Sequence, residues 1–138
     1  MLSPSLVTSA ALIVLLLGAL HLAHTFFSRN FDPRDGGELK ALMQKTSPRI
    51  TSQTSMWRGQ VGFHASHSLG AVLFGIVYID LALAHPGVLF GSWVLAGVGS
   101  AYLLAMVALA RRYWFRVPLI GLGLSAALYL AGVVTGWP

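Results

Sequence analysis

Four histidines are the residues of this chain with the clearest capacity for chemistry, and they come in two pairs. His21 and His24 lie three residues apart in "LGALHLAHTFF", and His64 and His67 repeat this spacing in "GFHASHSLG". Residues three apart share one face of a helix. Each pair therefore predicts two imidazoles on one side of a helix, and neutral imidazole is a ligand for zinc, copper and iron.

Two kinds of cofactor fit this pattern. A transition metal, namely iron, copper or zinc, would be held by all four imidazoles, or by three while the fourth acts on substrate. Haem b would take two histidines as axial ligands, with Arg58 beside a propionate. We favour the bare metal. The chain has no cysteine, which excludes thiolate ligands. A carboxylate-bridged di-iron centre is disfavoured, because the nearest acids would reach only if the chain folded back: Asp32, Asp35 and Glu38.

Hydroxyl and guanidinium groups accompany the histidines. The hydroxyls are predicted to hydrogen-bond the imidazoles and fix their tautomers, with bonds to their own helix as the alternative. They belong to Thr25, Ser66 and Ser68. The guanidinium groups are predicted to bind an anionic head group, with anchoring of helix ends as the alternative. They belong to Arg58, Arg111, Arg112 and Arg116.

The amino-acid composition indicates whether the chain lies in water or in a lipid membrane. Hydrophobic residues make up 56% of the 138 residues and charged residues only 9%, whereas soluble domains carry roughly 25% charged residues. This predicts an integral membrane protein. The net charge of +5 does not indicate nucleic-acid binding, because the basic residues flank apolar segments instead of forming a stripe. We interpret them as topology determinants and contacts to anionic lipids.

Four apolar segments must position the histidines. They cover about residues 6–27, 60–83, 88–109 and 117–134, each near the roughly 20 residues that a membrane-spanning helix needs. Short connections make neighbouring helices antiparallel. The sequence thus predicts an all-α fold, a single domain over residues 1–138 that forms an integral membrane bundle of four antiparallel helices. The first segment lacks the marks of a cleaved signal peptide, and we expect it to be retained.

The basic residues predict the orientation. All nine Lys and Arg lie in the first and third connections, around residues 28–59 and 110–116. The positive-inside rule places these connections in the cytoplasm. Both termini would then lie outside a multi-pass protein of the bacterial inner (plasma) membrane. In the last span, "GVVTG" places Gly132 and Gly136 four residues apart, which permits close helix contact.

This topology brings the two histidine pairs to one depth. Counting 1.5 Å per residue from the cytoplasmic ends, His24 matches His64 and His21 matches His67. The four imidazoles are predicted to converge roughly 5–10 Å below the inner interface. Interhelical hydrogen bonding without a ligand is the alternative.

The first connection is the only long one, and it contains "GGELKALMQK". Leu39, Leu42 and Met43 share one face there, opposite Lys40 and Lys45. The pattern predicts a short amphipathic helix on the inner leaflet. It serves either as a lid over the inner helix ends or as a docked linker.

The stretches "GALHLAHTFF" and "GFHASHSLG" resemble those of small uncharacterised four-helix membrane proteins of bacteria. The resemblance covers the pattern of spans and these two stretches. It implies the four-helix fold and no particular activity.

Three functions are compatible with these features. The favoured one is a metal-dependent redox enzyme acting on a lipid-soluble substrate from the inner leaflet. The alternatives are a haem b electron carrier, with the same histidines as ligands, and a non-catalytic subunit of a larger membrane complex. Expected partners are membrane lipids, a lipid-soluble substrate, and further copies of the chain or a larger complex.

Overall fold

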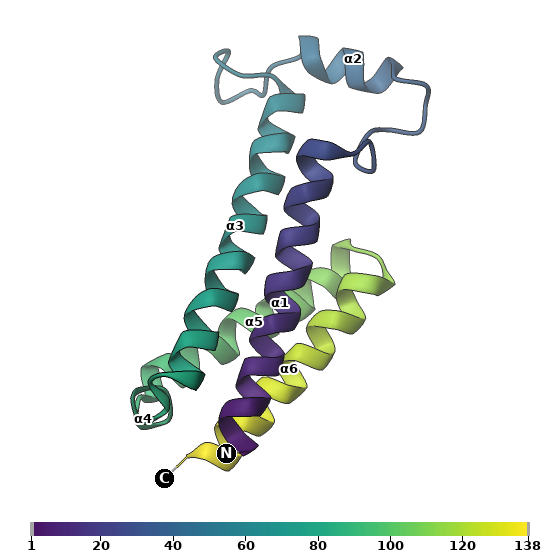
Figure 1. Ribbon diagram of the computed structural model, residues 1–138. Coiled ribbons are helices and arrows are strands. Elements are labelled where there is room, and N and C mark those ends of the chain that lie inside the picture. Colours follow the sequence, from purple (N-terminus) through teal and green to yellow (C-terminus); the bar gives the residue numbers. More distant parts are fainter. Residues whose placement is uncertain (1, 138) are drawn as a thin grey trace. The chain divides into compact units, whose positions relative to one another are not determined.

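The computed structural model describes residues 2–137, which form six helices and no strand (Figure 1). The helices are α1 (Leu2–Phe27), α2 (Glu38–Lys45), α3 (Met56–Leu83), α4 (Pro86–Gly91), α5 (Trp93–Tyr113) and α6 (Arg116–Gly136). Four of them, α1, α3, α5 and α6, are long and apolar enough to cross a membrane. The predictions of an all-helical chain and of four apolar helices are confirmed, and they indicate a multi-pass membrane protein.

The third long apolar helix begins at Trp93, later than the position of about residue 88 predicted for the third span. That position lies in α4, a separate short helix with Pro86 in its first turn. The spanning helix α5 begins afresh because the Ser92 hydroxyl accepts a hydrogen bond from the backbone N–H of Leu95 at 3.3 Å, which caps a new helix. The other three predicted spans lie within α1, α3 and α6, each of which is a few residues longer.

The described chain forms two compact units. The tyrosine unit consists of residues 2–17 and 71–137, and the histidine unit consists of residues 18–70. Helices α1 and α3 each contribute to both units. The prediction of a single domain over residues 1–138 therefore stays a prediction.

Glycines bring helices into close contact within the tyrosine unit. A Cβ atom on Gly132 of α6 would lie 2.8 Å from Cγ2 of Val7 in α1. A Cβ atom on Gly75 of α3 would lie 2.6 Å from Cβ of Leu15 in α1. Both distances are shorter than atoms tolerate, so glycine is required where α3 and α6 meet α1.

Buried hydroxyl groups hydrogen-bond to backbone carbonyls of neighbouring helices in the same unit. The buried Ser125 of α6 donates to the carbonyl of Ala10 in α1 at 2.9 Å. Tyr78 of α3 and Tyr129 of α6 both donate to the carbonyl of Leu95 in α5, at 2.8 and 3.3 Å. Each hydroxyl thereby finds a partner where lipid offers none.

In the histidine unit, a turn precedes α2. Gly36 and Gly37 have φ angles of 79° and 106°, a left-handed conformation that glycine adopts readily. The Asp35 carboxylate accepts hydrogen bonds from the backbone N–H groups of Gly37 and Leu39. These donors lower the pKa of Asp35 below its usual value. The carboxylate thus satisfies N–H groups that a helix start leaves unpaired.

The predicted amphipathic helix in the first connection is confirmed as α2. A loop follows it and leads back to α3. The carbonyl of Thr46 accepts a hydrogen bond from the N–H of Met56 at 2.8 Å, which closes the loop at its base. The end of α2 is thereby fixed beside the start of α3.

Candidate functional site: a histidine cluster

Three of the four predicted histidines lie together in the histidine unit. Nε2 of His21 in α1 lies 3.1 Å from Nδ1 of His64 in α3, within hydrogen-bond distance. The ring centroid of His67 lies 5.6 Å from that of His21. All three side chains are half-buried, whereas His24 is exposed. The structure therefore brings together three imidazoles, which we call the histidine cluster (His21, His64 and His67).

Phe31, from the connection after α1, covers this cluster. Its ring stacks on His64 with 4.6 Å between centroids and an angle of 15°. The same ring lies 4.7 Å from that of His21. An apolar ring in this place keeps water from one side of the two hydrogen-bonded imidazoles. Phe31 was not predicted from the sequence as part of the site, although it is the one aromatic residue in "SRNFDPRDGG".

An ionic contact holds the segment that carries Phe31. The Lys40 ammonium lies 2.9 and 3.0 Å from the two carboxylate oxygens of Asp32. It also lies 4.5 Å from the ring centre of Trp57 in the first turn of α3, a cation–π distance. Lys40 therefore ties together the connection, α2 and α3. Hydrogen bonding to Lys40 holds the pKa of Asp32 below its usual range, so the carboxylate is ionised at neutral pH and the contact weakens as the pH falls through that lowered pKa.

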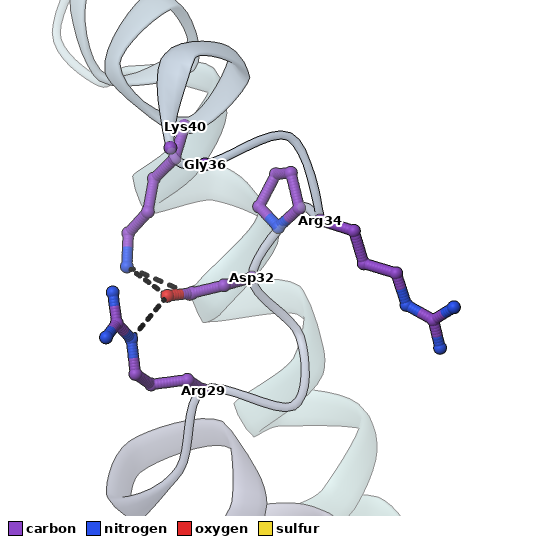
Figure 2. Close-up of a pocket in the computed structure, with 7 residues that line it drawn as sticks. Arg29, Asp32, Arg34, Gly36 and Lys40 are labelled. Atoms are coloured by element: carbon purple, nitrogen blue, oxygen red, sulfur yellow. Dashed lines mark hydrogen bonds and ion pairs between the residues drawn. The ribbon is translucent and has the colours of Figure 1, made fainter.

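Figure 2 shows the polar hollow next to this contact. Arg29 and Lys40 are directed at Asp32, whereas Arg34 is directed away from them. The hollow has a volume of about 280 Å³ and is lined by Arg29, Asp32, Pro33, Arg34, Gly36, Gly37 and Lys40. Because its one carboxylate is already paired with Lys40 and Arg29, the lining carries net positive charge.

The three predicted hydroxyl partners hydrogen-bond to backbone carbonyls. Thr25 donates to the carbonyl of His21 at 2.8 Å, and Ser68 donates to that of His64 at 2.7 Å. Ser66 donates to the carbonyl of Phe63 at 3.1 Å. These are the local bonds typical of hydroxyl residues inside helices. Thr25 and Ser68 thus contact the backbone of the two hydrogen-bonded histidines.

The four predicted head-group arginines are all exposed. Arg58 lies in the first turn of α3, in the histidine unit. Arg111 and Arg112 lie in the last turn of α5, and Arg116 begins α6, all in the tyrosine unit. Cations in the last turn of a helix are favourable because they face the negative end of its dipole. This accounts for the positions of Arg111 and Arg112.

The spacing within the histidine cluster can be compared with that of metal ligands. Two nitrogens bound to one tetrahedral zinc ion at about 2.0–2.1 Å lie about 3.4 Å apart. The 3.1 Å between His21 and His64 is close to this value. Within residues 2–137, however, no three His, Asp or Glu side chains stand in an arrangement ready to hold a metal ion. The third imidazole would have to turn toward the pair.

Comparisons of the chain with protein-family models, with curated proteins and with solved structures found no match.

Proposed function

We propose that this chain is an integral membrane protein that binds a transition-metal ion through His21, His64 and His67. The observation that carries the proposal is the 3.1 Å distance between ring nitrogens of His21 and His64. Both atoms are imidazole nitrogens, and neutral imidazole is a ligand for zinc, copper and iron. His67 completes the set by a side-chain rotation, since its ring already lies beside that of His21.

The environment supports a bound ion. Polar groups inside membrane-spanning helices are rare and commonly functional. Here the imidazoles are half-buried, and Phe31 lies over two of them. A hydrophobic shell around a metal site controls the access of water and the local dielectric constant. Phe31 would thus act as the cover of the metal site, with the Asp32–Lys40 contact holding its segment in place.

The same distance favours a bare metal over haem b. Two axial imidazole nitrogens on opposite sides of one ion lie about 4 Å apart when each bond is about 2 Å. His21 and His64 are closer than that, and the stacked Phe31 ring occupies space beside them. If the ion is iron or copper, redox chemistry on a lipid-soluble substrate becomes available to the site.

The metal content of the purified protein tests this proposal. The protein is purified in mild detergent without a metal-affinity step, and its visible spectrum and elemental content are measured on one sample. We expect about one zinc, copper or iron ion per chain and no Soret band. A Soret band would instead identify a haem protein. No metal after purification and no uptake on reconstitution would refute the metal proposal.

A second function is favoured by a specific observation. The contact between His21 and His64 has the length of an ordinary hydrogen bond, and such bonds between membrane helices contribute about 0.6 kcal/mol. In that case the histidines join α1 to α3 and the chain acts as a non-catalytic subunit. This function predicts no bound metal, so the same measurement separates the two.

The proposal includes the orientation of the chain in the bacterial inner membrane, with four antiparallel spanning helices and both termini outside. The distribution of charge supports it: all nine Lys and Arg lie in the two connections assigned to the cytoplasm. Short loops rich in Lys and Arg stay on the cytoplasmic side.

Single cysteines test this orientation directly, because the chain has none of its own. Ser52, in the loop after α2, and Ala84, in the connection after α3, are both exposed. In intact cells, a membrane-impermeant maleimide is expected to label Ala84→Cys and not Ser52→Cys. Both should react once the membrane is permeabilised. Labelling of Ser52→Cys in intact cells would reverse the proposed orientation.

A further inference from the structure

Helix α2 turns its apolar side away from the rest of the histidine unit. Leu39 and Leu42 are 47% and 61% exposed, and no residue of α2 is buried. Met43 is only partly exposed, and it lies between Leu39 and Lys40 around the helix. Lys40, about 100° around the helix from Leu39, is the residue that contacts the unit, at Trp57. The helix therefore turns Lys40 toward Trp57 and leaves Leu39 and Leu42 exposed on its outer side.

The surroundings of α2 are those of a membrane surface. Figure 1 shows α2 running crosswise to the ends of α1 and α3 within the histidine unit. Both of those helices are apolar enough to span a bilayer, so a helix that crosses their ends lies along the membrane plane. Ile50, in the loop after α2, is 92% exposed, and Phe27, the last residue of α1, is also exposed.

The charge of this region complements an anionic surface. Residues 28–59 contain six Lys and Arg and three Asp and Glu. Two of the three carboxylates are engaged within the protein, since Asp32 pairs with Lys40 and Asp35 binds N–H groups at the start of α2. Exposed cations remain in this region of the chain, at Arg34, Lys45, Arg49 and Arg58.

We propose that α2 docks on the anionic phospholipid surface of the inner leaflet. Leu39 and Leu42 enter the boundary between head groups and acyl chains, and the exposed cations contact lipid phosphates. An interfacial helix buries its apolar face about 5–10 Å into this boundary. The inference rests on the proposed membrane embedding and is independent of metal binding.

A lipid surface fits this face better than a protein partner does. Stable protein interfaces bury about 800 Å² on each side and involve roughly 20–30 residues, whereas α2 has eight residues. An isolated helix of fewer than about 12 residues is also marginal in water. Contact with lipid over its whole apolar face would stabilise α2 where it already lies.

Fluorescence at two positions of α2 tests the proposal. Leu42→Cys and Gln44→Cys, in the full-length chain, are labelled with an environment-sensitive fluorophore and reconstituted into vesicles containing phosphatidylglycerol. Gln44 is the matched control, because it is exposed and lies about 160° around the helix from Leu42. We expect aqueous iodide to quench the label at residue 42 about threefold less than the label at residue 44, and nitroxide-labelled lipids to quench residue 42 more.

The outcomes separate this inference from the proposed membrane embedding. Equal iodide quenching at both positions, in protein that resists alkaline extraction from the vesicles, would refute docking of α2 and leave embedding intact. Release of the protein by alkaline extraction would refute embedding itself. Protection of residue 42 from iodide without quenching by nitroxide lipids would mean that another protein surface covers the face, which also refutes lipid docking. Protection that is lost in vesicles of phosphatidylcholine alone would support the role of the cations.

Discussion

Replacing His64 with alanine is expected to weaken metal binding by about 100-fold or more. Loss of an outer partner of a metal ligand costs about 10–100-fold in affinity, so loss of a ligand itself should cost at least the upper end of this range. His21→Ala is expected to have the same effect, because the two residues form the 3.1 Å pair. The measurement is metal affinity of the purified variants by competition with a chromophoric chelator.

His24→Ala is the matched control for these variants. His24 lies one helical turn from His21 in α1, but its side chain is exposed. We expect it to keep its metal with an affinity within about twofold of the parent protein, because surface substitutions have small effects. Equal losses in all three variants would mean that the ion is held differently from our proposal. Unchanged affinity in His21→Ala and His64→Ala would remove these histidines from the site.

A stability measurement separates metal binding from helix joining. If His64 only hydrogen-bonds to His21, His64→Ala should lower the free energy of unfolding by about 0.6 kcal/mol, with or without a chelator. If His64 binds metal, the loss of stability should appear mainly in the metal-loaded protein, since a bound ligand stabilises the folded state by an amount that grows with the logarithm of its affinity. Chelator added to the parent protein should then reproduce the effect of the variant.

The four long apolar helices could be predicted from the sequence, because an apolar segment in lipid must satisfy its backbone hydrogen bonds internally. Apolar segments of about 20 residues must be helical in a bilayer, and α1, α3 and α6 contain the predicted spans. The break between α4 and α5 could not be seen in hydropathy, since both sides of it are apolar. It depends on Ser92, one hydroxyl that caps a helix.

The histidine cluster could be predicted in part. Counting residues from the membrane interface gave a common depth, and three of the four imidazoles do lie together. Depth does not fix the rotation of a helix about its axis, however: His21 lies within hydrogen-bond distance of His64, whereas His24, which was matched to His64 in depth, is exposed. The position of Phe31 could not be predicted by counting residues along the helices. It depends on the path of the connection, which is set by the contact of Lys40 with Asp32 and Trp57.

The chain contains 15 glycines, and sequence alone does not distinguish those that helix contacts require. The "GVVTG" spacing is an example, since it arises easily in so glycine-rich a chain. The structure separates them by what a Cβ atom would meet. Gly132 and Gly75 lie against α1, whereas nothing lies within 4 Å of the Cβ position of Gly97.

Gly99→Ala is expected to lower the free energy of unfolding by about 2–3 kcal/mol, the upper part of the range for overpacked cores. A Cβ atom on Gly99 of α5 would overlap Oη and Cζ of Tyr129 and lie 2.9 Å from Cε1 of Tyr78. Tyr129 is completely buried, and its hydroxyl bonds to the carbonyls of Leu95 and Ala96. The ring therefore cannot move aside without losing these bonds. Unfolding by a denaturing detergent in mixed micelles measures the change.

Gly97→Ala supplies the control from the same helix, two residues away. Its Cβ position is open, so the added methyl group meets no neighbour. Both substitutions replace glycine by alanine inside α5 and therefore share the same gain in helix propensity, at most about 1 kcal/mol. The difference between the two variants isolates the overlap with Tyr129. If Gly99→Ala proved as stable as Gly97→Ala, the close contact of α5 with α6 at Tyr129 would be wrong. A loss of stability confined to Gly99→Ala would establish that this glycine allows the tyrosine hydroxyl to reach its carbonyl partners.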